Sequence, residues 1–307
     1  MIVTHNSAAV IGRCLDALAE MAPSATAIVI DNASDDGTLE EARARSGVQI
    51  IANRENRGFA AAVNQGVQAC SAEYLLMLNP DARILTALDG VIEASRAYGL
   101  AAGALLDKTG RPQKGFTIRR FPTPLTFWFE LSGLNRMWPS NPVNRRYRYL
   151  DRDLDQKGPV EQPAGAFLMF RRDVWQRLGG LDEGFYPVWF EDVDFCRRAT
   201  TEGYRIEYVP RVAAEHAGGH SVLQIPQGCR ARYWCASLLR YGSKHFGSSS
   251  YRSVCLAVAL TCVPRAVAGM IRERSLAPIL SCINIFGFAV RRLISLRKSG
   301  EEPRLVS

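Results

Sequence analysis

Short apolar runs alternate with longer amphipathic stretches over the first hundred residues. Runs rich in Ile, Val, Leu and Tyr predict strands at 2–3, 27–30, 48–52 and 74–78. Between them, apolar residues recur every three or four positions, which predicts a helix capped by Ser7 and helices at 38–45 and 59–69. This alternation is typical of βαβ units, so we expect an α/β fold with a largely parallel sheet flanked by helices.

The pattern is interrupted in the middle of the chain and then resumes. Six prolines between residues 107 and 160 break any long element, which predicts irregular structure over the carboxyl ends of the strands. The later pattern predicts a strand at 162–170, helices at 173–178 and 191–201, and a strand at 206–209.

Charge divides the chain into two parts. Residues 1–229 carry 25 Lys and Arg against 27 Asp and Glu, a net charge of −2, whereas residues 230–307 carry 13 against 3, a net charge of +10. We therefore expect one domain at 1–229 and a basic, apolar helical extension at 230–307.

The extension contains two apolar segments, 254–271 and 276–296, which prolines and arginines interrupt. A clear transmembrane span needs about 20 uninterrupted apolar residues, so neither segment is expected to be one. Two interpretations remain open. The segments are interfacial helices on an anionic membrane surface, or they are core helices with a solvated rim.

The expected compartment follows from the cysteines and the first residues. The eight cysteines form no Cys-x-x-Cys pair and no zinc-ligand spacing, which favours a reduced setting. No secretory signal precedes the first predicted strand. We expect a cytoplasmic protein that is peripheral on the inner face of the cell membrane.

Acidic residues follow two of the predicted strands. Asp31 ends the strand at 27–30, and Asn79-Pro80-Asp81 ends the strand at 74–78. In open α/β sheets, ligands bind outside the carboxyl ends of the strands, so both acids are expected at one crevice. Glu191 and Asp192 open a helix that would add a further carboxylate.

Seven motifs, occurring in order, carry a family resemblance. They are 2–7 (IVTHNS), 29–38 (VIDNASDDGT), 56–66 (NRGFAAAVNQG), 78–81 (LNPD), 165–169 (GAFLM), 179–185 (GGLDEGF) and 191–196 (EDVDFC). Over residues 1–221 the chain resembles family 2 glycosyltransferases, more narrowly their rhamnosyltransferase-like members. The resemblance implies the GT-A fold, a Rossmann-like nucleotide-binding mixed sheet flanked by helices.

The resemblance also implies roles for individual residues. Asp192 is the implied catalytic base, and Asp81 and His216 are the implied ligands of a divalent metal, Mn²⁺ or Mg²⁺. Trp189 and Glu191 are the implied contacts to the acceptor or sugar. The implied nucleotide-sugar contacts are Val3, Thr4, Asp31, Arg57, Gly58, Asn64, Asn79 and Gly165.

Each role has a purely structural alternative. Asp31 also fits a turn, Asn64 fits a satisfied surface amide, and the acids at 191–194 fit the first turn of an exposed helix. His216 also fits an ordinary loop, and Trp189 fits core packing. Asn79 stands where the family has the first Asp of Asp-x-Asp, which removes one charge from the metal site.

The expected function is inverting transfer of one sugar, with rhamnose the leading candidate, from a dTDP or UDP donor to a glycan or lipid-linked acceptor of the cell envelope. A processive polysaccharide synthase is disfavoured, since residues 227–231 (QGCRA) break the Gln-x-x-Arg-Trp motif of such enzymes. A non-catalytic nucleotide-binding or membrane scaffold is the other alternative. No nucleic-acid partner is expected, because the basic tail carries no recognition motif.

Overall fold

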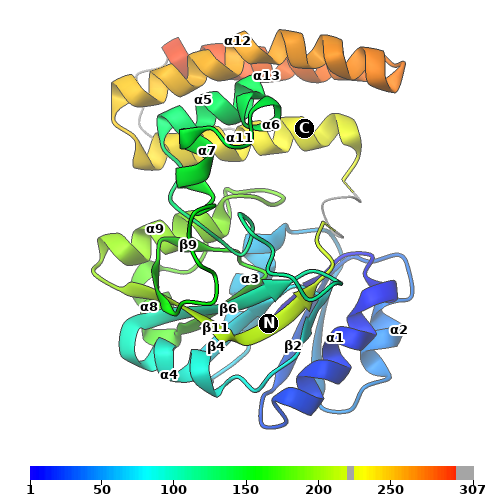
Figure 1. Cartoon of the computed structure of the whole chain (residues 1–307). Helices are drawn as coiled ribbons and strands as arrows, with labels where there is room; N and C mark the ends of the chain where they lie inside the picture. The colour runs from blue at the N-terminus through cyan, green and yellow to red at the C-terminus, as the bar shows by residue number, and fades with distance from the viewer. Residues whose placement is uncertain (220–224, 295–307) are drawn as a thin grey trace. The chain divides into compact units, whose positions relative to one another are not determined.

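The computed structural model describes residues 1–219 and 225–294, so the end of the expected extension, 295–307, lies outside the described residues. The chain forms two compact units (Figure 1). Unit 1 comprises 1–121, 148–183 and 191–224, and unit 2 comprises 122–147, 184–190 and 225–307. Both units are built from segments that are distant in the sequence. The expected functional division after residue 229 stays a prediction.

Unit 1 is built on a mixed sheet with helices on its faces, which confirms the predicted fold class. Within the described residues its nine strands follow the order β3-β2-β1-β4-β10-β6-β11-β5, with β8 paired to β11. The strands are β1 Ile2–Thr4, β2 Ala27–Asn32, β3 Val48–Asn53, β4 Tyr74–Leu78, β5 Ala82–Ile84, β6 Gly99–Leu106, β8 Gly158–Val160, β10 Phe167–Arg171 and β11 Arg205–His216. A separate ribbon pairs β7 Ile118–Arg119 with β9 Gln162–Pro163.

The helices of unit 1 bury one apolar stripe each. They are α1 Ala8–Met21, α2 Thr38–Arg43, α3 Phe59–Gln68, α4 Asp89–Tyr98, α8 Arg172–Leu178 and α9 Glu191–Thr201. In α1, for example, Ile11, Leu15 and Leu18 are buried at helical spacing and join a core with the apolar strands. Burial of this stripe is what fixes the helix against the sheet.

The order of the strands places the site. The chain runs from β1 outward through β2 and β3, and then returns to add β4 on the other side of β1, with all these pairings parallel. The sheet therefore reverses its winding between β1 and β4. Such a switch point leaves a crevice at the carboxyl ends of the strands, where ligands bind.

Three expectations about unit 1 need correction. The strand predicted at 206–209 continues to His216 and includes a register shift between Val209 and Ala213, so its far end was missed. The elements β5, α4 and β6 had not been assigned. The strand predicted at 162–170 is divided into β9 and β10, and β10 runs antiparallel between β4 and β6, which makes the sheet mixed.

Unit 2 is helical. Its helices are α5 Pro124–Ser132, α6 Leu134–Met137, α7 Pro142–Tyr147, α11 Gln227–His245, α12 Ser248–Glu273 and α13 Ala277–Ile294. The predicted irregular structure is therefore wrong for 124–147. Pro124 and Pro142 begin helices, because proline is tolerated in a first turn whose N–H groups have no helical partner, and Thr123 completes a capping box.

The helix α12 corrects the expectation that neither apolar segment of the extension is long and apolar enough to span a membrane. By length and composition, its section Ser248–Ile271 is apolar enough to cross a membrane, with a mean hydropathy of 2.0. Half of that section is buried inside the protein. The sequence analysis placed the start of the apolar segment at 254, whereas the helix begins six residues earlier and continues through Pro264.

Candidate functional site

The carboxyl ends of β1 and β2 carry the first predicted site residues. Thr4 lies opposite Asp31 in the parallel register, and its hydroxyl donates a 2.8 Å hydrogen bond to Oδ1 of Asp31. Ser34 adds its backbone N–H, 3.0 Å from Oδ2, and its hydroxyl, 2.5 Å from Oδ1. Val3, Thr4 and Asp31 are buried. Asp31 therefore organises the turn after β2, and its contact with a nucleobase stays a prediction.

Gly58 lies beside this turn at the start of α3. Its φ of 83° lies in the left-handed region that glycine tolerates, and its carbonyl accepts a 3.1 Å hydrogen bond from Nδ2 of Asn32. The turn after β2 and the start of α3 are thus joined. Arg57 is exposed next to this junction, where a guanidinium can reach an anionic ligand.

The amide of Asn64 is used inside unit 1. Its Nδ2 donates to the carbonyl of Leu181 and to Oε1 of Glu183, both at 2.9 Å, and its Oδ1 accepts from the N–H of Leu181 at 3.0 Å. These bonds attach the 181–183 segment to α3. They fit the structural alternative for Asn64, and its nucleotide contact stays a prediction.

The structure brings together the two predicted metal ligands. In the antiparallel pairing of β5 and β11, His216 lies opposite Ala82, the residue after Asp81. The imidazole Nε2 is 3.4 Å from Oδ1 of Asp81, and the two side chains are 1% and 3% exposed. The backbone N–H of Gly218 donates to the other carboxylate oxygen at 3.0 Å, which leaves Oδ1 directed at the imidazole.

Gln113 holds the imidazole of His216 in place. Its Nε2 donates to the His216 carbonyl at 2.7 Å, and its Oε1 lies 3.1 Å from Nδ1 of the ring. The ring of Phe116 stacks on the imidazole with a centroid separation of 5.2 Å. Sequence reasoning missed both residues, because they lie in the proline-rich segment and have no motif of their own.

These contacts leave His216 neutral with a defined tautomer. Burial lowers the pKa of His216 below its ordinary value of 6.5, although the neighbouring Asp81 opposes the shift. A proton on Nδ1 satisfies Oε1 of Gln113, so the lone pair of Nε2 faces Asp81. Nδ2 of Asn79 lies 3.3 Å from the same nitrogen and can donate to its lone pair, a contact that a bound cation would replace.

The donor set fits a divalent cation. An imidazole nitrogen and a carboxylate oxygen 3.4 Å apart, each presenting a lone pair to the other, suit two ligands of one ion at about 2.0–2.2 Å each. Among residues 1–219 and 225–294 there is no group of three His, Cys, Asp or Glu side chains that could hold a metal alone. The pair Asp81 and His216 would therefore share the ion with ligands from outside the protein.

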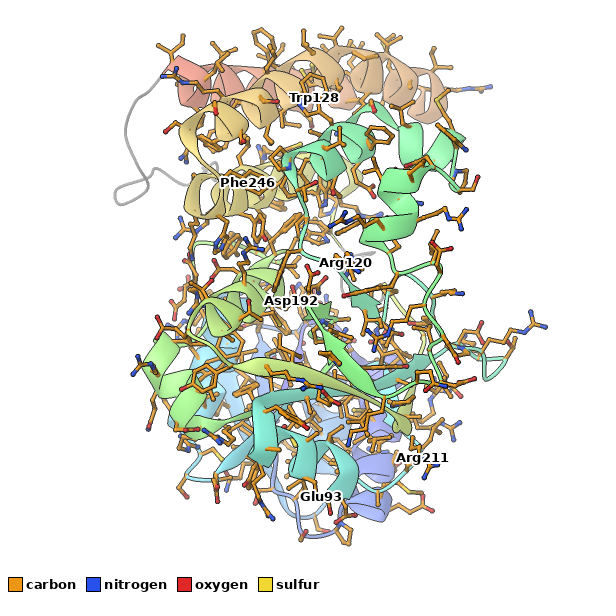
Figure 2. The ribbon with its side chains drawn as sticks, turned by 60° about the vertical axis from the view of Figure 1, so that its left-hand side comes forward. Glu93, Arg120, Trp128, Asp192, Arg211 and Phe246 are labelled. Atoms are coloured by element: carbon orange, nitrogen blue, oxygen red, sulfur yellow. The ribbon has the colours of Figure 1, made fainter. Side chains whose placement is uncertain are left out.

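Asp192 opens α9 with its carboxylate fixed by backbone donors (Figure 2). The N–H of Gly165 donates to Oδ2 and the N–H of Val193 donates to Oδ1, both at 2.8 Å. A β-carbon added at Gly165 would be 3.0 Å from the Asp192 Cβ, so the backbone approaches as closely as a glycine allows. Gln162, which the sequence analysis missed, points Nε2 at Oδ2 from 3.5 Å.

Asp192 and the Asn79-Pro80-Asp81 turn lie at the same edge of the sheet. Because β10 runs antiparallel to β4, its first residues lie beside the carboxyl end of β4. The N–H of Asn79 donates to the carbonyl of Ala166 at 3.1 Å, and the preceding Gly165 holds Asp192. This short chain of contacts connects the two acids.

The neighbours of Asp192 are buried rather than exposed. Glu191 is 4% exposed and Asp194 is fully buried. Asp194 pairs with Arg198 at 2.8 Å, and Arg198 also donates to the carbonyls of Leu178 and Gly180. The first turn of α9 is therefore not the solvated acidic turn of the structural alternative.

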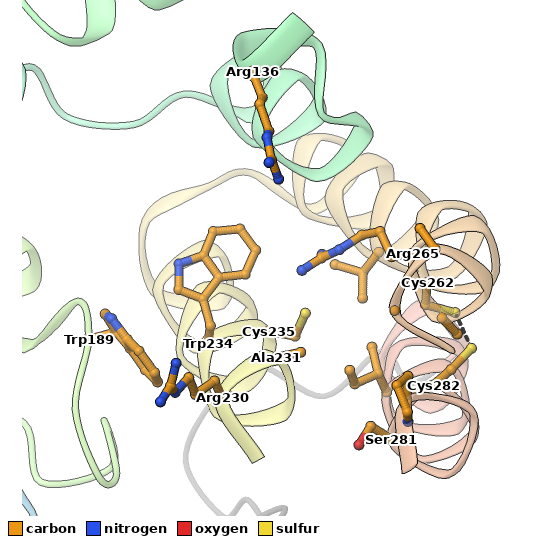
Figure 3. Close-up of a pocket in the computed structure, with 16 residues that line it drawn as sticks. Arg136, Trp189, Arg230, Ala231, Trp234, Cys235, Cys262, Arg265, Ser281 and Cys282 are labelled. Atoms are coloured by element: carbon orange, nitrogen blue, oxygen red, sulfur yellow. Dashed lines mark hydrogen bonds between the residues drawn. The ribbon is translucent and has the colours of Figure 1, made fainter. Parts of the chain in front are cut away.

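Trp189 belongs to unit 2, where it lines a cavity (Figure 3). Trp189 and Phe190 have φ values of 87° and 72°, a backbone conformation that bulky residues rarely adopt. Phe190 is packed among Phe127, Trp234 and Tyr241. Core packing therefore applies to Phe190, while Trp189 faces the cavity.

Comparison with known sequences agrees with the geometry. Residues 1–179 match "Glycosyl transferase family 2", and residues 130–235 match "Glycosyltransferase like family 2". The chain is 27% identical over 235 residues to the N-acetylglucosaminyl-diphospho-decaprenol L-rhamnosyltransferase of Mycobacterium tuberculosis, covering 72% of this chain and 75% of that protein. It is 26% identical to rhamnosyltransferase WbbL of Escherichia coli, covering 54% and 60%.

Solved structures share the fold. A mannosyltransferase from Pyrobaculum calidifontis, in complex with GDP-Man and Mn²⁺, superposes with a TM-score of 0.52 at 15% identity, covering 95% of this chain and 84% of that one. GalNAc-T7 with UDP, GalNAc and Mn²⁺ gives a TM-score of 0.51 at 16% identity, covering 70% and 42%. At these identities the likeness supports the fold alone.

Proposed function

The chain belongs to glycosyl transferase family 2, and we propose that it is an inverting, metal-dependent enzyme that transfers one sugar from a nucleoside diphosphate donor to a hydroxyl group. One observation carries the proposal. The buried pair of Asp81 and His216 and the oriented carboxylate of Asp192 lie at the same edge of the sheet, joined through Asn79 and Gly165.

Asp81 and His216 would hold the cation. When bound, a divalent cation neutralises the charge that develops on the diphosphate as the glycosidic bond breaks. The clamp from Gln113 keeps Nε2 available, and Gly218 keeps one oxygen of Asp81 turned toward it. Both solved relatives contain Mn²⁺ beside a nucleotide or nucleotide sugar, which supports this class of ion.

Asp192 would act as the general base. Inverting transfer needs a carboxylate that takes the proton of the acceptor hydroxyl while that oxygen attacks the anomeric carbon opposite the leaving group. The N–H groups of Gly165 and Val193 fix the orientation of Asp192, and the first turn of α9 favours a negative charge. Oδ1, which accepts the Val193 N–H, keeps a lone pair for the proton.

The names of the relatives support a donor sugar and a class of acceptor. Both named sequence relatives are rhamnosyltransferases, and the name of the mycobacterial protein includes a diphospho-decaprenol acceptor. We therefore assign rhamnose from a dTDP or UDP donor and a lipid-linked, cell-envelope acceptor, reached from the cytoplasmic face of the membrane.

The experiment that tests the mechanism separates binding from transfer. Asp81→Ala should abolish transfer and weaken Mn²⁺ binding in the presence of the nucleotide. Asp192→Asn keeps the size of the side chain and should abolish transfer while donor affinity, measured by calorimetry, changes less than about twofold, since the base does not touch the donor in the ground state. Transfer that persists in purified Asp192→Asn would remove this residue from the mechanism.

Membrane association is part of the proposal and rests on unit 2. Its described residues carry 13 Lys and Arg against 2 Asp and Glu, a net charge of +11. Apolar side chains on α12 and α13 are exposed although their helices pack together. They are Leu256, Leu260, Val263, Val267 and Ile271 of α12, and Leu280, Ile283, Phe286 and Ile294 of α13. A basic unit with an exposed apolar face suits anionic lipid.

Charge placed on that face tests the membrane role. Leu260→Glu with Ile283→Glu should reduce sedimentation with phosphatidylglycerol vesicles about tenfold or more, because each change removes apolar contact and adds repulsion. The matched control is Glu40→Gln on α2 of unit 1. Equal sedimentation of the double variant and the wild type would exclude these helices as the membrane contact.

A further inference from the structure

The helices of unit 2 line a partly open cavity of about 780 Å³ whose lining includes none of Asp81, Asp192 and His216 (Figure 3). Its walls come from α6, α11, α12, α13 and Trp189, all within unit 2. A volume of this size is in the range of sites for small organic ligands. These lining residues belong to unit 2, whereas Asp81 and Asp192 belong to unit 1.

The lining is basic and contains no acid. Arg136, Arg230 and Arg265 come from three different helices, and the described lining residues include no Asp or Glu. Within residues 1–219 and 225–294, neither Arg136 nor Arg265 takes part in a salt bridge. Figure 3 shows the side chains of Arg136 and Arg265 directed toward the same side of the cavity, near the indole of Trp234. Guanidinium groups that line one cavity from three helices suit a multiply charged oxyanion.

The remaining lining is aromatic and apolar. The indoles of Trp189 and Trp234 form part of the wall, and the guanidinium of Arg265 lies 5.7 Å from the ring centroid of Trp234. Val258 and Ile285 supply aliphatic surface from α12 and α13. Inorganic phosphate has no apolar surface to bury here, whereas a chain of isoprene units can bury against these walls.

The backbone near Trp189 supports a ligand role. Trp189 and Phe190 both hold positive φ values, and Phe190 is anchored in the aromatic core of unit 2. Strained backbone of this kind persists where the surroundings hold it, and it is common at ligand sites. Here it turns the Trp189 indole to the cavity instead of the core.

We propose that this cavity binds the head of an isoprenoid diphosphate, with the diphosphate between the arginines and the first isoprene units against the apolar wall. This inference rests on the proposed function, because a lipid-linked acceptor of that chemistry is what a transferase of this kind would glycosylate. The exposed apolar face of α12 and α13 lies on the side of these helices opposite the residues that line the cavity. The same two helices thus offer one face to a bilayer and one to the ligand.

Direct binding tests the inference without any transfer reaction. Farnesyl diphosphate is titrated into the full-length protein in EDTA, so that no cation at Asp81 recruits the diphosphate, and tryptophan fluorescence reports on Trp189 and Trp234. Arg136→Gln with Arg265→Gln should weaken binding at least about tenfold, since each arginine contributes charge-assisted hydrogen bonds. Arg252→Gln, an exposed arginine of α12 outside the cavity, is the matched control and should change affinity less than about twofold.

Additional titrations separate the contribution of the apolar chain to the affinity from that of the diphosphate charge. Farnesol tests the apolar wall alone, inorganic diphosphate tests the charge alone, and each should bind at least about tenfold more weakly than farnesyl diphosphate. Asp81→Ala should bind farnesyl diphosphate like the wild type. Equal binding by the Arg136→Gln, Arg265→Gln variant, or competition by phosphatidylglycerol vesicles as strong as by farnesyl diphosphate, would overturn the proposal.

Failure here and failure of the transferase proposal give different results. Loss of transfer in Asp192→Asn with farnesyl diphosphate bound normally concerns only the catalytic residues. Transfer that is retained while wild-type protein does not bind farnesyl diphosphate would reject the cavity as the acceptor site and leave the enzyme assignment intact.

Discussion

The two contacts of Gln113 with His216 lead to a quantitative prediction about metal affinity. Gln113 is not itself one of the proposed metal ligands, so its effect on the metal would act through His216. Replacing Gln113 by Met keeps the length of the side chain but removes both hydrogen bonds, the 2.7 Å bond to the His216 carbonyl and the 3.1 Å contact with Nδ1. The imidazole then loses the partner that fixes its tautomer. Loss of such a partner of a metal-ligating histidine typically costs about 10- to 100-fold in metal affinity.

The same change also affects stability. The His216 carbonyl and ring are buried, and an unsatisfied buried polar group costs about 1–3 kcal/mol. We therefore expect the free energy of unfolding of Gln113→Met, measured by urea denaturation, to fall by about that amount while the protein remains folded.

The assay is calorimetric titration of Mn²⁺ in the presence of UDP or dTDP, because the proposed site has two protein ligands, Asp81 and His216. Gln49→Met, an exposed glutamine of β3, is the matched control and should behave like the wild type. Saturating Mn²⁺ should restore turnover of Gln113→Met, since Asp192 is unchanged. Unaltered Mn²⁺ affinity in folded Gln113→Met would refute the role of the clamp.

Two further predictions concern protonation and positioning. Because the pKa of His216 is lowered below 6.5 in the folded state, the unfolded chain takes up this proton first as the pH falls, so the free energy of unfolding in EDTA should decrease below pH 6.5. His216→Asn should lose this part of the pH dependence, and an unchanged profile would contradict a buried neutral imidazole. Gly165→Ala places a methyl group 3.0 Å from the Asp192 Cβ and should lower kcat about 10- to 100-fold with little change in the KM for the donor. Gly287→Ala, with no atom within 4 Å of its added carbon, is the control, and equal kcat values for the two variants would show that the close approach of Gly165 is not needed.

Local patterns in the sequence determined much of unit 1. The strands β1 to β4 and the helices between them follow from runs of apolar residues and from apolar stripes at helical spacing, which depend only on neighbouring residues. The positions of Asp31 and Asp81 at strand ends were predicted for the same reason. The opening of α9 at Glu191 was also predicted from local pattern.

Tertiary structure decided what these residues contact. His216 reaches Asp81 because β11 extends to pair with β5, across 135 positions of the chain, and Gln113 arrives from a segment with no readable period. Antiparallel insertion of β10 beside β4 brings Gly165, and with it Asp192, to the same edge. Such pairings close long loops, which costs conformational entropy. No local pattern in the sequence shows which distant strand forms contacts that are favourable enough to offset this cost.

Unit 2 shows the same division most clearly. The basic charge and apolar character of residues 230–307 were evident from composition alone. Composition did not show that α6 and the strained Trp189 line one cavity together with α11, α12 and α13. These three segments are far apart in the sequence and share no periodic signal. The sequence thus determined the chemistry of each element, while long-range packing decided which side chains could act together, since only burial against a distant partner selects one pairing among many.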